Sequence, residues 1–116
     1  MNHNQMKSLL QRDKEFLKNV FESDSIQKSR RLITFATDSE IITLMKYLHF
    51  ISNGEIPIKK ENFNALEKRH LQLIKKKFVN KQSLFQALQL SRKDKLQILL
   101  KLIKIFPHLL SPLFRE

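Results

Sequence analysis

Apolar residues recur through most of the chain at the three- and four-residue spacing of an amphipathic helix. The first such stripe predicts a helix over about residues 5–21, which should end at the sequence ESDS, residues 22–25. Most charged residues of this segment fall off the stripe. Its apolar members are Met6, Leu9, Leu10, Phe16, Leu17, Val20 and Phe21.

Two further helices are marked by residues that cap helix N-termini. Ser25 precedes a short helix predicted over about residues 26–35. Thr37 and Glu40 fit a capping box, in which each side chain accepts a hydrogen bond from the backbone N–H of the other residue. This pattern predicts a third helix over about residues 38–52.

The third helix should end at Asn53-Gly54, since both residues tolerate the left-handed conformation of a helix end. An extended connector should follow over residues 55–58, because the residue before Pro57 is disfavoured in the α region. A basic helix is predicted over about residues 60–78. At 100° per residue its apolar side chains lie within about 80° of Phe63. The opposite side carries Lys68, Arg69, Lys75 and Lys76.

Two helices are predicted beyond this point. A short one should run through residues 84–90 with Phe85 on its apolar side, and Ser91 should cap a last one over about residues 92–106. The last helix is apolar over most of its circumference, so it should lie either at the centre of the bundle or against a partner. Its narrow polar strip is Lys93, Gln97, Lys101 and Lys104.

These elements define an all-α fold, a single compact bundle of five to six short helices. A chain of 116 residues with one Gly and three Pro suits one helical domain and leaves few positions for hairpins. We divide it into a near-neutral helical half, residues 1–58, a basic helical half, residues 59–104, and an apolar tail, residues 105–116.

Charge is distributed unevenly between these parts. Residues 1–58 hold eight Lys or Arg against seven Asp or Glu, whereas residues 59–104 hold thirteen against three. A lysine-rich composition can reflect an AT-rich genome, but that bias would enrich both halves and would not remove acids from the second. The asymmetry therefore indicates a polyanionic partner.

The sequence carries no recognisable catalytic or cofactor motif. It has no cysteine, and its single glycine excludes a Gly-rich phosphate loop. The four histidines fall in different predicted elements, so none forms a local metal-binding pair. We expect a protein that is not an enzyme and that holds neither cofactor nor metal.

Nucleic acid is the expected partner, DNA in preference to RNA. Lysine outnumbers arginine eleven to two in residues 59–104, which favours phosphate contacts over base reading and therefore sequence-independent binding. Phenylalanines of this half are expected in the core rather than exposed for stacking. A helix-turn-helix over residues 71–88 is the weaker alternative. The predicted contact surface is Lys59, Lys60, Lys68, Arg69, Lys75, Lys76, Lys81, Arg92 and Lys93.

The apolar tail supports an alternative of a different class. Its residues Leu109, Leu110, Leu113 and Phe114 could dock on a protein partner, on a capsid, on a second copy of the chain or, less favourably, on a membrane surface. The N-terminus lacks the apolar stretch of a secretory signal, which predicts a location inside the cell or within a virion.

Several short motifs occur in a recognisable order. They are the basic run at Lys28, Arg30 and Arg31, the helix start at residues 37–40, the turn NGEIPI at residues 53–58, the step Lys68-Arg69-His70 and the tail LLSPL at residues 109–113. This order resembles small basic proteins encoded by adintoviruses and by Polinton or Maverick elements. The chain departs from that pattern at Phe85 and Gln86, where basic residues are expected. The resemblance implies a virion-associated protein that condenses DNA.

Overall fold

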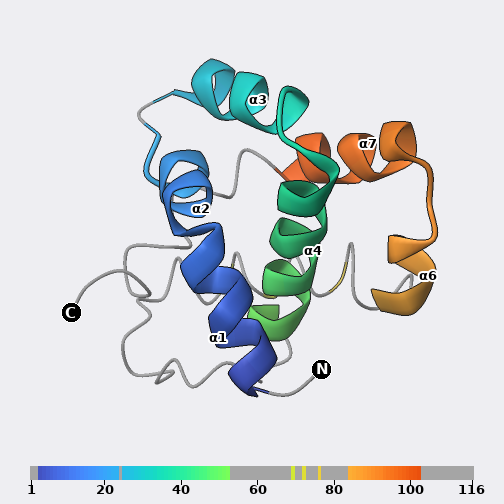
Figure 1. Ribbon diagram of the computed structural model, residues 1–116. Coiled ribbons are helices and arrows are strands. Elements are labelled where there is room, and N and C mark those ends of the chain that lie inside the picture. The colour runs from blue at the N-terminus through green and yellow to red at the C-terminus, as the bar shows by residue number, and fades with distance from the viewer. Residues whose placement is uncertain are drawn as a thin grey trace.

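The computed structural model describes residues 3–23, 25–52, 69, 72, 76 and 84–102. This part of the chain contains helices and no strand, which confirms the all-α prediction (Figure 1). The helices are α1 (His3–Arg12), α2 (Lys14–Phe21), α3 (Ile26–Thr34), α4 (Asp38–Ser52), α6 (Leu84–Leu88) and α7 (Arg92–Leu102).

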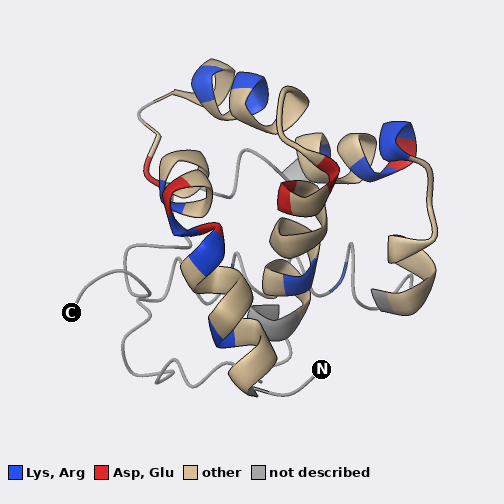
Figure 2. Ribbon diagram, viewed as in Figure 1, with Lys and Arg blue, Asp and Glu red and all other residues tan. Residues whose placement is uncertain are grey.

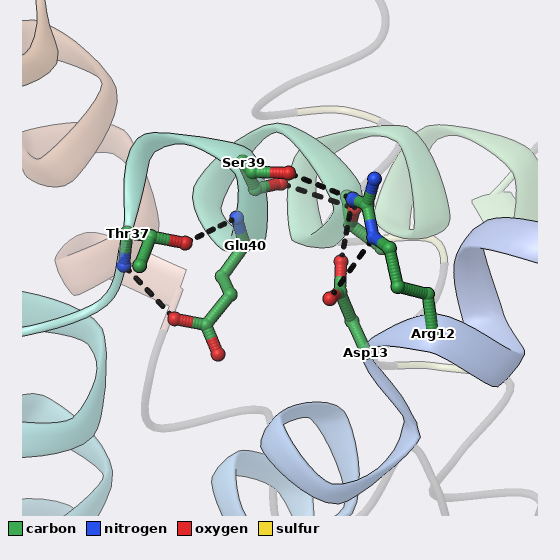
Figure 3. A network of polar contacts seen from close by, with 6 residues as sticks. Arg12, Asp13, Thr37, Ser39 and Glu40 are labelled. Atoms are coloured by element: carbon green, nitrogen blue, oxygen red, sulfur yellow. Dashed lines mark hydrogen bonds and ion pairs between the residues drawn. The ribbon is translucent and has the colours of Figure 1, made fainter.

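The predicted helix starts are confirmed by their capping hydrogen bonds. The Ser25 hydroxyl accepts the backbone N–H of Lys28 at 3.1 Å, which starts α3. Thr37 and Glu40 form the reciprocal capping box, with distances of 2.9 Å to the Glu40 carboxylate and 3.1 Å to the Thr37 hydroxyl (Figure 3). α4 then spans the predicted residues 38–52.

The first predicted helix is wrong in one respect, because it is divided at Asp13 into α1 and α2. Asp13 has φ −106° and ψ 21°, outside the helical range. Asp13 still makes both hydrogen bonds of an α-helix. Its N–H donates to the Leu9 carbonyl and its carbonyl accepts the N–H of Leu17, both at 3.0 Å. The division is therefore a local distortion between two helical segments rather than a loop.

A side-chain network at the α1–α2 junction accounts for this distortion. Arg12 donates to both carboxylate oxygens of Asp13, at 3.3 and 2.9 Å. The same guanidinium donates to the hydroxyls of Ser39, at 2.8 Å, and Thr43, at 3.1 Å, in the first turns of α4 (Figure 3). These tertiary contacts fix the junction against α4, and helical spacing in the sequence carries no sign of them.

The network also changes the acidity of Asp13. Partial burial works to raise the pKa of the carboxyl, but hydrogen bonds from Arg12 and Thr43, together with the charge of Arg12, outweigh it and hold that pKa below its usual range. The Thr43 hydroxyl has one proton, which is also directed at the Ser39 carbonyl at 3.1 Å. The Thr43 proton is thus shared between two acceptors, whereas Arg12 donates two hydrogen bonds to the Asp13 carboxylate.

The core forms around α4, which lies between α1 on one side and α6 and α7 on the other (Figure 1). Tyr47 is fully buried, and its ring meets that of Phe21 edge to face at 5.5 Å between centroids. Burial raises the pKa of Tyr47 well above its usual value. The core residues are Met6, Leu17, Val20, Phe21, Ile33, Ala36, Ile41, Leu44, Met45, Tyr47, Leu48, Ala87 and Leu99.

The last two helices lie at the edge of this core. α6 packs against α4 through Ala87 and half-buried Leu88, so the prediction that Phe85 faces the core is wrong, and its side chain is 74% exposed. In α7 only Leu99 is fully buried among the described side chains. Three predicted elements fall outside the described residues: the connector, the apolar tail and most of the helix over residues 60–78. Of that helix, residues 69, 72 and 76 are described.

Candidate nucleic-acid interface

The orientation of α3 is fixed by one polar and one apolar anchor. Ser29 and Ile33 are buried, and the Ser29 hydroxyl donates to the Val20 carbonyl in the last turn of α2 at 2.9 Å. That carbonyl belongs to the end of a helix, where carbonyls have no partner within the helix. With this face turned inward, the cations of α3 lie on the outer side. They are Lys28, Arg30 and Arg31, all exposed.

The orientation of α7 follows the predicted pattern. Ser91 caps the helix by accepting the N–H of Asp94 at 3.2 Å, and Leu99 anchors it in the core. Lys93, Gln97 and Lys101 are exposed, as expected for the polar strip. The spacing of these residues, four and eight positions apart, places them along one side of the helix.

Arg92, a predicted contact residue, also makes contacts within the fold. Its guanidinium forms an ion pair with Asp38 and donates to the carbonyls of Thr34, at 3.2 Å, and Ala36, at 2.6 Å. The start of α7 is thereby fastened to the turn between α3 and α4. Because these contacts occupy both terminal nitrogens, we assign Arg92 to holding the helices together rather than to the contact surface.

Packing of α3 against α7 brings together two strongly basic helices that are far apart in the sequence. α3 carries three cations and no acid, and α7 carries four cations and one acid. In Figure 2 the cations of α3 lie at the top of the view and those at the start of α7 at its upper right, on either side of the place where the two helices meet. We name Lys28, Arg30, Arg31, Lys93 and Lys101 the α3–α7 basic surface.

Two acids close to this surface have partners inside the fold. Asp38 pairs with Arg92, and the Glu40 carboxylate accepts the backbone N–H of Thr37. Each is therefore directed toward the helix junction. A third acid, Asp94, is exposed beside Lys93 on α7 and lowers the positive potential there.

Four of the predicted contact residues can be placed. Lys93 belongs to the α3–α7 basic surface. Arg92 forms what we call the Arg92 bridge, its contacts with Thr34, Ala36 and Asp38. Arg69 and Lys76 are exposed, as is Gln72 between them, which is what the basic side of the predicted helix requires. Lys59, Lys60, Lys68, Lys75 and Lys81, and the docking residues Leu109, Leu110, Leu113 and Phe114, lie outside the described residues.

The cations of α3 are absent from the predicted contact surface because residues 1–58 have almost no net charge when they are counted together. Acids concentrate around α2, at Asp13, Glu15, Glu22 and Asp24, whereas residues 26–34 contain none. A count taken helix by helix would have found this separation. The position of α3 beside α7 could not have been found in this way, because it depends on tertiary packing.

Comparison with known proteins identifies no relative. No family model, curated protein or solved structure matches the chain. Within the described ranges, no helix is both long and apolar enough to cross a membrane. The same residues hold no group of three His, Asp or Glu side chains arranged to bind a metal ion.

Proposed function

We propose that this protein is a non-enzymatic nucleic-acid-binding protein that contacts phosphates without reading sequence, and that its role is to condense or package DNA. The observation that supports this function best is the α3–α7 basic surface, where two helices place exposed cations on one part of the molecule. The resemblance to virion-associated basic proteins points to the same role.

The local structure favours phosphate contacts over base reading. The basic surface is made of the sides of two helices, and its cations are flexible side chains of the kind that neutralise phosphates. The second helix of the alternative helix-turn-helix would be α6, of which five residues, Leu84–Leu88, are described. Such a short helix is poorly suited to lie along a major groove and present several side chains to base edges.

The proposal is tested by fluorescence anisotropy with a random-sequence duplex of about 30 base pairs over a series of salt concentrations. We expect affinity to fall steeply with salt and to be the same for a second, unrelated sequence. Charge reversal at Arg30→Glu and Arg31→Glu together should weaken binding at least about tenfold and lower the salt slope by about two, since each phosphate contact contributes about one.

The matched control is the pair Lys7→Glu and Lys14→Glu. These exposed lysines lie on α1 and α2, and their reversal changes the net charge of the protein by the same amount. Equal losses in the two double variants would show that net charge alone drives binding and would contradict the assigned surface. Binding by the wild-type protein that is absent, or insensitive to salt, would contradict the proposed function itself.

A further inference from the structure

Phe35 is the most exposed large apolar side chain of the described residues, with 81% of its surface accessible. It follows the last residue of α3, between Thr34 and buried Ala36. Single exposed apolar residues are common and need no explanation by themselves. Phe35 differs from such residues in how firmly its backbone is held and in what surrounds it.

The backbone on both sides of Phe35 is fixed by hydrogen bonds. Its N–H donates to the Arg31 carbonyl at 3.1 Å, and the N–H of Ala36 donates to the Ile33 carbonyl at 3.2 Å. Arg92 donates to the carbonyls of Thr34 and Ala36, the residues that flank Phe35. The ring is thus presented to solvent from a rigid turn, at the point where α7 is fastened to α3.

Phe35 continues a line of cations along α3. At 100° per residue it lies about 40° around the helix from Arg31 and about 20° from Lys28, so its direction falls between theirs. At 1.5 Å per residue, Arg31 and Lys28 precede it by about 6 and 10 Å along the helix axis. Phe35 therefore follows a row of two cations, Lys28 and Arg31, at the C-terminal end of α3.

We infer that Phe35 is a stacking platform for an unpaired base, and that single-stranded DNA is the form of nucleic acid which this surface binds best. The inference rests on the proposed function, because Arg31 and Lys28 would hold the phosphates on one side of the stacked base. Base stacking on an exposed ring beside a cationic track is the common mode of sequence-tolerant single-strand binding.

The same geometry discriminates against a duplex. In a duplex the bases are stacked on one another, and a ring on the outside of a helical protein surface meets only sugar and phosphate. A single strand offers both base faces. A duplex should therefore use the cations alone, whereas a single strand should use the cations and the ring.

The chain supplies a matched control in Phe85. Its side chain is nearly as exposed as that of Phe35, at 74%, but α6 contains no cation. The test measures affinities for a thymidine oligonucleotide of about 20 nucleotides and for a duplex, in Phe35→Leu, Phe85→Leu and the wild-type protein. Leucine keeps an apolar side chain and removes the aromatic face, so the substitution separates stacking from apolar docking.

We expect Phe35→Leu to weaken single-strand binding by about 5- to 150-fold, the range for losing one stacked base, and to leave duplex affinity unchanged. The salt slope should also stay the same, because no charge is removed. Phe85→Leu should leave both affinities unchanged. Thermal unfolding followed by circular dichroism should give the same midpoint for all three proteins.

A direct readout comes from the absence of tryptophan in the chain. Phe35→Trp introduces a single tryptophan, whose emission should be quenched by the oligonucleotide and not by the duplex, while Phe85→Trp serves as the control. Equal quenching at both positions, or unchanged single-strand affinity in Phe35→Leu, would overturn the inference while leaving salt-dependent duplex binding intact. Failure of the wild-type protein to bind either nucleic acid would instead remove the proposed function and this inference together.

Discussion

α3 and α4 are consecutive helices joined by a turn of three residues, yet they contribute to the molecule in opposite ways. α4 buries side chains on several sides, whereas α3 buries Ser29 and Ile33 and exposes its cations. The buried residues of α4 are Ile41, Thr43, Leu44, Met45, Tyr47 and Leu48. Because only two side chains of α3 are buried, most of its surface can carry charged side chains. The comparison separates residues that stabilise the fold from those available for binding.

The largest effect should come from the centre of α4. Leu44→Ala should lower the free energy of unfolding by about 2–5 kcal/mol, because it removes a fully buried side chain and leaves a cavity. Leu32→Ala, at a half-buried position of α3, should cost roughly half as much. Urea denaturation followed by circular dichroism measures both. Equal losses would mean that α3 is as much a part of the core as α4.

An intermediate effect should come from the polar anchor of α3. Ser29→Ala should lower the free energy of unfolding by about 1–2 kcal/mol, because the buried Val20 carbonyl loses its donor. Thr34→Ala is the control, since the Thr34 hydroxyl donates to the Arg30 carbonyl at 2.7 Å on the exposed side of the same helix. Its cost should stay within about 0.5 kcal/mol. A Ser29 variant as stable as the Thr34 variant would contradict the anchoring role.

The smallest effect should come from Asp13, which ties the α1–α2 junction to the start of α4. Because the pKa of Asp13 is lowered in the fold, its stabilising contribution is complete above the unfolded-state pKa of about 3.9 and is lost as the pH falls through the lower folded-state value. Wild type should exceed Asp13→Asn in free energy of unfolding by less than about 1 kcal/mol at pH 5. This difference should shrink toward pH 2 in urea titrations, and a constant difference would exclude the ionic contribution.

The sequence predicted the local features of this fold well. The starts of α3, α4 and α7 follow from Ser25, Thr37 with Glu40, and Ser91, because capping depends on residues only two or three positions apart. The outward strip of α7 was also predicted, since the buried Leu99 and the exposed lysines follow one helical period.

Features that depend on distant residues could not be predicted in the same way. Asp13 lies in a segment whose apolar residues follow one helical period, and the contacts of Arg12 with α4 at this junction are tertiary. Phe85 is exposed because the face of α6 that packs against α4 carries the small side chain of Ala87 and not the ring of Phe85. For the candidate site, the charge of each helix was readable, but the assignment of Arg92 required knowing that it reaches Thr34 and Ala36.

The Arg92 bridge has a consequence for how the molecule is assembled during synthesis. Its contacts join residues separated by 54 to 58 positions, so forming them carries the entropic cost of closing a long loop. These contacts cannot form until α7 has been synthesised. α1 to α4 leave the ribosome first and can gather around the apolar residues of α4. The α3–α7 basic surface is completed only when α7 has also emerged. A nascent chain therefore carries the cations of α3 well before it holds the finished surface.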